Sequence, residues 1–252
     1  MVTVSVCVAT YNGSRHVEHQ LRSILAELTV VDEVVVVDDA STDDTVSVVS
    51  AIDDPRIRLE VLDTNGGYVR AFEHAIGRAR GDAIFLSDQD DEWIPGRRAV
   101  LLDALENASV VASNVVLLGS DRAMLSPIFQ RPWLLRSSQS RHWRRNRARM
   151  ILGIAPYYGC AMAMRREALS EILPFPGFLA ESHDLWIAAV GNAARSLTHV
   201  DSPTVRRRLH DANASSERPR SFRKVIRSRI LVVQMLAAAR RRQARRVGAL
   251  AD

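Results

Sequence analysis

The feature that most constrains the fold is a repeated alternation of short apolar runs with segments of helical periodicity in the first ninety residues. The apolar runs are predicted strands, at 2–9, 33–37, 57–62 and 83–87. Predicted helices separate them, at 17–28, 42–52 and 69–80, and Ser41 or Thr42 is expected to cap the second of these helices. Uniformly apolar strands separated by helices are typical of a mostly parallel sheet covered on both faces. The sequence therefore predicts an α/β fold.

A polar cluster follows each predicted strand. These clusters are Thr10-Tyr11-Asn12, Asp38-Asp39, Asn65-Gly66-Gly67 and Asp88-Gln89-Asp90-Asp91. Right-handed crossovers bring the carboxyl ends of parallel strands to one edge of the sheet, which is where such sheets bind ligands. We therefore expect the four clusters to converge on one site.

The second half of the chain is less regular. A strand is predicted at 110–118, an apolar stretch surrounds Gly159, and a helix is predicted at 184–190. The segment 131–149 contains seven arginines and no acid, and is expected to be a loop or a broken helix.

Charge is divided unevenly between the two halves. Residues 1–126 contain 10 arginines and 21 acidic residues, whereas residues 127–252 contain 24 basic and 8 acidic residues. This division suggests a cation site in the first half and an anionic partner for the second. Alternatively, 33 arginines against one lysine indicate a coding bias.

The Asp88-Gln89-Asp90-Asp91 cluster is the sharpest local signal. Carboxylates at alternate positions after a strand can project in the same direction, and hard oxygen ligands suit Mg²⁺ or Mn²⁺ bound to phosphate. The alternative is a solvated acidic turn. One of Asp38 and Asp39 could accept hydrogen bonds from a nucleobase or a ribose, whereas the alternative for this turn is helix capping by Ser41 or Asp43. Arg70 could bind phosphate or pair with Glu73.

The order and spacing of these motifs resemble a known family. They are the segments 9–13, 37–43, 65–67, 81–82 and 85–91. Over about residues 2–213 the chain resembles the inverting GT-A glycosyltransferases of family 2, and the Asp-Gln-Asp-Asp form resembles their rhamnosyltransferase-like branch. The resemblance implies a GT-A (Rossmann-like) domain at 1–215, followed by a basic helical extension at 216–252.

The resemblance also implies a nucleotide-diphosphate sugar donor, UDP- or dTDP-linked, and a divalent metal, Mn²⁺ or Mg²⁺. The implied donor-binding residues are Thr10, Tyr11, Asn12, Asp38, Asp39, Asn65, Arg70, Asp88 and Gln89. The implied metal ligands are Asp90, with Asp88 secondary, and His210.

On the acceptor side, Glu181-Ser182-His183-Asp184 resembles the acid-Asp pair of the family, with His183 where Glu is commoner. Asp184 is then the implied general base, although it could also cap the following helix. The other implied acceptor-side residues are Gly159, Cys160, His183 and Trp186.

The activity implied is a one-step displacement that inverts the anomeric centre. The acceptor is a hydroxyl of a saccharide or a lipid-linked saccharide, and rhamnosyl transfer in cell-surface polysaccharide synthesis is the specific form. Two alternatives come from the residues themselves. A nucleotidyltransferase would need a glycine-rich phosphate loop, which Thr10-Tyr11-Asn12-Gly13 lacks. A basic nucleic-acid-binding module is suggested by the pI of about 9.8, but it would not need the acidic edge, and no nucleic-acid partner is expected.

The location of the protein is expected to be cytoplasmic, because the sequence contains no secretory signal, no membrane-spanning run and only two cysteines. At 222–239 one stripe of an expected amphipathic helix contains Phe222, Ile226, Ile230, Val233 and Ala237. This stripe could contact the inner face of an anionic membrane, or it could pack against protein.

Overall fold

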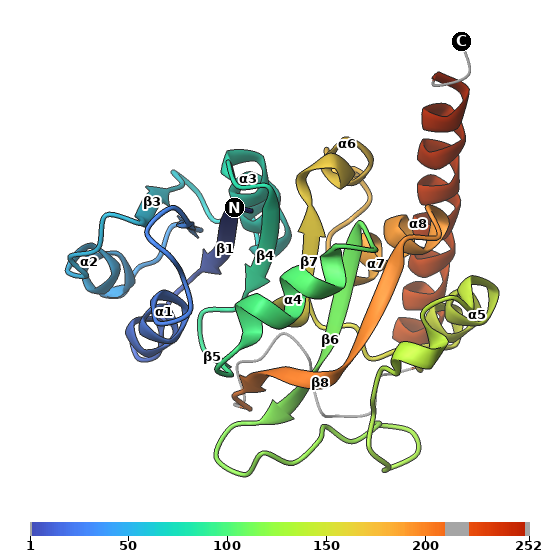
Figure 1. Cartoon of the computed structure of the whole chain (residues 1–252), viewed down its shortest axis with the longest axis horizontal. Helices are drawn as coiled ribbons and strands as arrows, with labels where there is room; N and C mark the ends of the chain where they lie inside the picture. Colours follow the sequence, from blue (N-terminus) through green and yellow to red (C-terminus); the bar gives the residue numbers. More distant parts are fainter. Residues whose placement is uncertain (1, 210–221, 250–252) are drawn as a thin grey trace.

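A computed structural model describes residues 2–209 and 222–249. The described residues form one sheet with the strand order β3-β2-β1-β4-β7-β6-β8-β5 (Figure 1). The strands are β1 (Val4–Thr10), β2 (Glu33–Asp38), β3 (Ile57–Val61), β4 (Ala83–Ser87), β5 (Glu92–Trp93), β6 (Val110–Leu117), β7 (Met162–Arg165) and β8 (Leu197–Arg207). The α-helices are α1 (Val17–Leu25), α2 (Thr45–Ser50), α3 (Tyr68–Arg78), α4 (Arg97–Leu105), α5 (Trp143–Leu152), α6 (Leu169–Ile172), α7 (His183–Ala193) and α8 (Phe222–Ala249).

The first four strands confirm the predicted parallel arrangement. Strand β1 pairs in parallel with β2 and with β4, and β2 pairs in parallel with β3. Thr10 lies opposite Asp38 in this register. The carboxyl ends of these strands therefore meet at one edge of the sheet, as predicted.

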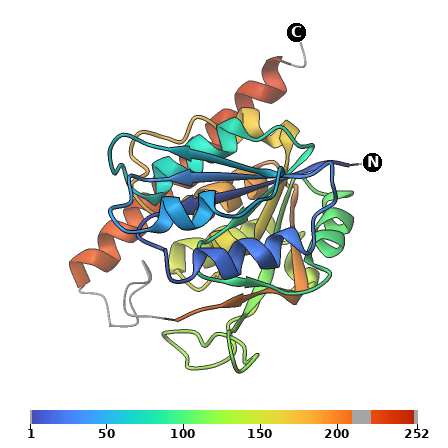
Figure 2. The same cartoon turned by 90° about the vertical axis from the view of Figure 1, so that its left-hand side faces the viewer.

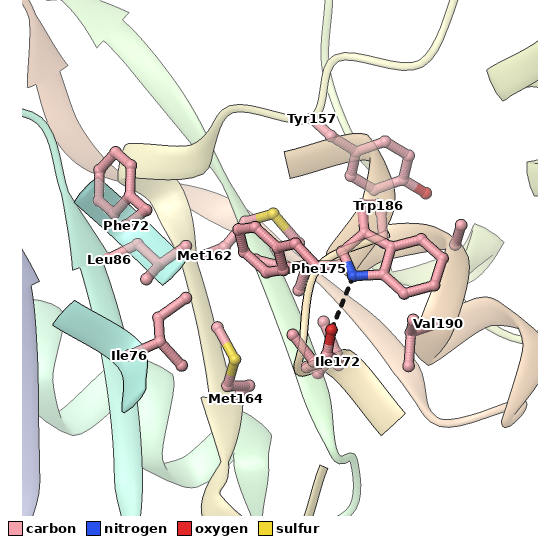
Figure 3. Packing of buried hydrophobic residues seen from close by; sticks show 14 of the residues in the cluster. Phe72, Ile76, Leu86, Tyr157, Met162, Met164, Ile172, Phe175, Trp186 and Val190 are labelled. Carbon is pink, nitrogen blue, oxygen red and sulfur yellow. Dashed lines mark hydrogen bonds between the residues drawn. The ribbon is translucent and has the colours of Figure 1, made fainter. Parts of the chain in front are cut away.

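Helices cover both faces of the sheet, and the strands divide their side chains between two cores. Val6 and Val8 of β1 pack in the core beneath α1, α2 and α4, whereas Cys7 belongs to the core beneath α3, α7 and α8. Figure 3 shows part of the second core, where Phe72, Met162 and other apolar side chains pack together. The alternation follows from the period of two along a strand and explains why these strands are uniformly apolar.

The predicted cap of α2 is wrong. The helix begins at Thr45, whose backbone N–H donates to Asp43 Oδ1 at 3.0 Å, and the side chain of the N-cap residue Asp44 forms no capping hydrogen bond. The Ser41 hydroxyl instead donates to Asp38 at 2.6 Å, and the backbone N–H of Thr42 donates to the Asn12 side chain at 2.8 Å. Ser41 and Thr42 therefore fix the turn between β2 and α2.

The second half of the sheet is mixed. Strand β7 is antiparallel to both β4 and β6, whereas β6 and β8 are parallel. The basic segment 131–149 contains a short 3-10 turn at Ser137–Gln139 and then α5. The mostly parallel arrangement thus describes the first half, and the reversed β7 joins that half to the second.

Helix α8 packs on the domain beside α7, and its C-terminal end extends past the sheet in both views (Figures 1 and 2). Its buried side chains are Val232, Met235, Leu236 and Ala239. Three residues of the stripe predicted from sequence point away from these buried side chains: Ile226, Ile230 and Val233 are 44%, 54% and 50% exposed. None of the described helices is long and apolar enough to cross a membrane.

Candidate active site

A cavity of about 460 Å³ lies where the carboxyl ends of β1, β2 and β4 meet. Residues from both halves of the chain line it. The sequence-predicted residues on its wall are Thr10, Tyr11, Asp39, Asn65, Asp88, Gln89, Asp90, Gly159, His183 and Asp184. The structure therefore brings most of the predicted donor-side and acceptor-side residues into one site.

Asp39 fixes the glycine turn that follows β3. Its two carboxylate oxygens accept hydrogen bonds from the backbone N–H groups of Gly66 and Gly67, at 2.8 and 2.7 Å. Gly67 has a φ of 87°, a region that side chains disfavour, which explains the glycine at this position. The carboxylate thus joins the ends of β2 and β3 along the cavity wall.

Asp38 and Asn12 support this wall from behind and are outside the cavity lining. Buried Asp38 accepts a hydrogen bond of 2.8 Å from the Thr10 hydroxyl. Asn12 has a φ of 47°, and its backbone N–H donates a hydrogen bond of 2.9 Å to the Ser41 hydroxyl. Both side chains are therefore placed to hold the loop after β1 against the loop after β2.

Gln89 ties the loop after β4 to the loop after β1. Its side-chain oxygen accepts from the backbone N–H of Tyr11 at 2.9 Å, and its side-chain nitrogen donates to the Tyr11 carbonyl at 3.0 Å. The Tyr11 side chain remains 44% exposed. An aromatic side chain at this position is available to contact a flat ligand group such as a base.

Besides Asp38 and Asn12, three described residues of the predicted site do not line the cavity, namely Arg70, Cys160 and Trp186. Arg70 lines a separate, smaller cavity of about 200 Å³ together with His74. It forms no ion pair with Glu73 or with any other acid among the described residues. Cys160 is buried beside the cavity. Trp186 is buried in the core, where its indole N–H donates to the Ile172 carbonyl at 3.0 Å (Figure 3). His210 lies outside the described residues.

Three acidic side chains gather at the end of β4. Asp88 and Asp90 line the cavity, and Asp91 is buried behind them. Burial, together with the negative charge of Asp90, raises the pKa of Asp88 to about 6. Burial, together with the charges of Asp88 and Asp90, raises the pKa of Asp91. The charge of Arg207 lowers the pKa of Asp88 but does not cancel the rise, so further positive charge would favour the ionised form of the cluster.

A divalent cation fits this cluster. One ligand atom each from Asp88, Asp91 and Cys160 lie within 4.8 Å of one another, and Asp91 Oδ2 is buried without a hydrogen-bond partner among the described residues. Burial raises the pKa of the Cys160 thiol well above its ordinary value, so the thiol stays protonated and is a poor ligand. The carboxylates, including the cavity-lining Asp90, are the groups that suit Mg²⁺ or Mn²⁺.

Asp184 lies in the first turn of α7 on the cavity wall. Its Oδ1 accepts a hydrogen bond of 2.7 Å from the N–H of Leu185, whereas the N-cap position itself is Ser182. Burial raises the pKa of Asp184 to about 6, and the charge of Asp88 adds to this effect. A carboxyl group with such a pKa can accept a proton near neutral pH.

His183 is a neutral, buried part of the same wall. Burial lowers its pKa to about 3, and neither ring nitrogen has a hydrogen-bond partner among the described residues. The ring stacks on Phe72 at 4.4 Å between centroids. A Cβ at Gly159 would lie 2.5 Å from His183 Nε2, so glycine is required there for this ring position.

The sequence interpretation did not assign roles to several residues that line the cavity. Arg207 at the end of β8 stacks over the Tyr158 ring at 5.2 Å, and its charge lowers the pKa of both Asp88 and Asp184. The Tyr68 hydroxyl accepts a hydrogen bond of 3.1 Å from the N–H of Ser182. The arginine run at the end of β8 was the available signal for Arg207, and Tyr68 directly follows the predicted glycine turn.

The fold is that of a GT-A glycosyltransferase. The structure of S. aureus TarS 1-349 in complex with UDP-GlcNAc superimposes with a TM-score of 0.63 and 19% sequence identity, over 96% of this chain and 72% of that chain. The corresponding complex with UDP gives a TM-score of 0.62 over 93% of this chain and 70% of that chain.

The sequence defines the family more closely. The profile described as Glycosyl transferase family 2 matches residues 5–173, and the chain belongs to this family. The succinoglycan biosynthesis protein ExoO of Rhizobium meliloti (strain 1021) is 38% identical over 120 residues, which cover 47% of this chain and 34% of that protein.

A UDP-Glc:alpha-D-GlcNAc-diphosphoundecaprenol beta-1,3-glucosyltransferase, WfaP of Escherichia coli, is 29% identical over 113 residues, or 45% of each chain. The alignments with ExoO and WfaP thus cover between about a third and about half of those proteins.

Proposed function

We propose that this family 2 glycosyltransferase is metal-dependent and inverting, and that it transfers a sugar from a UDP- or dTDP-linked donor to a hydroxyl of a saccharide or lipid-linked saccharide. The observation that carries the proposal is the single cavity that contains both the acidic cluster after β4 and Asp184, whose pKa is raised to about 6. In this proposal residues 1–215 form the catalytic domain and residues 216–252 the basic extension.

Asp184 is the proposed general base. Its carboxylate takes the proton of the acceptor hydroxyl while the hydroxyl oxygen forms a bond to the anomeric carbon. The bond from that carbon to the diphosphate breaks on the opposite face, and the nucleoside diphosphate leaves with the electron pair. The raised pKa of Asp184 supports this role, because the group then holds the proton it has accepted more readily than an exposed aspartate.

The donor is proposed to lie along the wall formed by the ends of β1, β2 and β3. Tyr11 and Asp39 are placed to contact the nucleoside, and Asp90 with Asp88 would hold the metal near the diphosphate. When bound, the divalent cation supplies positive charge that offsets the charge on the leaving diphosphate. Arg207, which lines the same cavity, is placed to add to that charge. Arg70 and His210 remain predicted donor and metal residues.

The names of two relatives support a role in cell-surface polysaccharide synthesis. ExoO is named for succinoglycan biosynthesis, and the WfaP acceptor is a sugar on diphosphoundecaprenol. We propose an acceptor of the same broad class. The Asp-Gln-Asp-Asp and His183-Asp184 motifs, which resemble the rhamnosyltransferase-like branch, favour a rhamnosyl donor.

We further propose that α8 contacts the inner face of an anionic membrane. The exposed Ile226, Ile230 and Val233 recur at helical spacing, the helix contains no acid, and Arg223 and Arg227 are exposed near this stripe. Co-sedimentation with phosphatidylglycerol vesicles tests this contact. Ile226→Gln with Ile230→Gln should release the protein, whereas exposed Val247→Gln should not. Equal binding of both variants would contradict the contact.

The donor proposal is tested by a thermal-shift panel of UDP, dTDP, GDP and CMP, each with and without Mn²⁺. We expect UDP or dTDP to raise the melting temperature, and we expect Mn²⁺ to increase that rise. The absence of stabilisation by any nucleoside diphosphate would contradict the proposal. Stabilisation that is the same with and without Mn²⁺ would contradict the metal dependence.

A further inference from the structure

A second cavity, of about 510 Å³, lies between the connection from β6 to α5 and the C-terminal end of α5. Its walls include the apolar side chains of Phe129, Trp133 and Ile154, together with Arg131 and Arg149. No carboxylate lines it. The cavity therefore combines an apolar surface with positive charge.

This second cavity adjoins the candidate active site through two aromatic rings. Trp133 meets Tyr158 edge to face, with 6.2 Å between ring centroids and an angle of 82°. Tyr158 lines the active-site cavity. The Trp133 indole N–H donates to the Ile154 carbonyl at 3.0 Å, which fixes the ring between the two spaces. A molecule in the second cavity would thus lie beside the wall that also contains Arg207.

The charge of Arg149 has no anionic partner in the described part of the chain. Arg149 is half-buried and donates to the neutral side-chain oxygen of Gln139. Burial lowers the pKa of Arg149, and the neighbouring Arg145 lowers it further, although Tyr157 opposes the shift. Half-burying a charged guanidinium without a carboxylate partner costs free energy, because the charge loses part of its hydration. A bound anion would offset this cost.

The rim of this cavity is apolar and exposed. Phe129 is 60% exposed, and its neighbour Ile128 is 58% exposed. Leu125, on the same connection, is 50% exposed. An apolar chain could leave the cavity along these side chains, while an anionic group remains near the arginines.

We propose that this second cavity binds the diphosphate and the first apolar carbons of a lipid-linked saccharide acceptor. The two guanidinium groups match a diphosphate, and the aromatic and aliphatic walls match a hydrocarbon chain. The acceptor sugar would then extend past Trp133 and Tyr158 toward Asp184. This inference rests on the proposed transfer to a lipid-linked acceptor and identifies the site for its anchor.

Calorimetric titration with farnesyl diphosphate tests the proposal. Inorganic pyrophosphate, which lacks the hydrocarbon chain, and digalacturonate, an anionic saccharide, are the comparison ligands. Farnesyl diphosphate should bind the wild type more tightly than either. Arg149→Gln and the exposed Arg131→Gln should each weaken farnesyl diphosphate binding about 10-fold, because each removes a charge-assisted hydrogen bond. Arg141→Gln, an exposed arginine outside the cavity lining, is the matched control and should leave the affinity within about twofold.

UDP binding, measured on the same proteins, separates this inference from the proposed function. Both cavity variants should retain wild-type UDP affinity, and UDP should not displace farnesyl diphosphate. Displacement by UDP would assign the probe to the active-site cavity and overturn the inference. Equal affinity for pyrophosphate and farnesyl diphosphate, tighter binding of digalacturonate, or unchanged affinity in Arg149→Gln and Arg131→Gln would also overturn it. Failure of the wild type to bind either UDP or dTDP would contradict the proposed function instead.

Discussion

The two parts of the active-site wall differ in how their polar groups are satisfied. At the ends of β1 to β4, Asp39 accepts two backbone hydrogen bonds and Gln89 exchanges two with Tyr11. At the start of α7, the ring nitrogens of His183 have no hydrogen-bond partner among the described residues, and burial raises the pKa of Asp184.

This difference separates binding from chemistry. Side chains that are hydrogen-bonded to the backbone of neighbouring loops form a preorganised surface for a ligand. A buried group with a shifted pKa is suited to exchange a proton. The wall at the strand ends is therefore expected to determine donor affinity and local stability, and the wall at α7 is expected to determine turnover. The predictions below test this separation.

The largest effect is expected from Asp184→Asn. Loss of the general base should lower turnover by about 10²–10⁴-fold, and UDP affinity should be unchanged. Turnover can be followed as nucleoside diphosphate released from the donor that the thermal-shift panel selects. Glu181→Gln, an exposed acid on the same cavity, is the matched control and should have a much smaller effect. Parallel loss of turnover and UDP affinity in Asp184→Asn would make Asp184 a structural residue.

The pH dependence of turnover should report the same carboxyl group. Because the pKa of Asp184 is raised to about 6, the base is deprotonated above that pH and protonated below it. Turnover should therefore fall about tenfold for each pH unit below 6, with donor binding monitored separately. A profile that stays flat down to pH 4.5 would exclude Asp184 as the titrating base.

A change on the other wall should act on stability and binding. Asp39→Asn leaves one oxygen to accept from two glycine N–H groups, so the free energy of unfolding should fall by about 1–3 kcal/mol. Urea denaturation measures this fall, and UDP should bind more weakly. Exposed Asp63→Asn in the neighbouring loop should change neither quantity. If Asp39→Asn lowered turnover at saturating donor as much as Asp184→Asn, the two walls would not be separable.

The smallest effect concerns a residue outside both walls. Arg242 stacks over Trp186 at 4.9 Å and donates to the carbonyls of Ile172 and Pro174. Arg242→Ala should lower the free energy of unfolding by about 1 kcal/mol without changing turnover. The exposed neighbour Arg241→Ala should have no measurable effect in the same urea titration. Equal stability of the two variants would show that α8 contributes little through Arg242.

The strand-end wall could be predicted from the sequence because its signals are local. Each polar cluster directly follows an apolar strand, and parallel pairing brings the strand ends together. The first strands and the helices between them follow from the same periodicity. The predicted cap of α2 by Ser41 is wrong because the Ser41 hydroxyl donates to a competing acceptor, Asp38, across the turn.

The other wall depends on contacts between distant segments, which a pattern along the chain does not reveal. Arg207 reaches the cavity only because β8 pairs with β6 and β5. Trp186 was expected near the acceptor, but it lies two positions after Asp184 on α7 and therefore points to another side of the helix, into the core. Cys160 next to Gly159 is likewise buried below the cavity.

The most direct test of the account is a crystal structure of the protein soaked with Mn²⁺ and UDP, with the ion located by its anomalous signal. We expect the ion on the carboxylates of Asp90 and Asp88, the base beside Tyr11 and Asp39, and Asp184 free to face the sugar side of the diphosphate. An ion bound elsewhere, with the carboxylates after β4 unliganded and UDP outside this cavity, would contradict it.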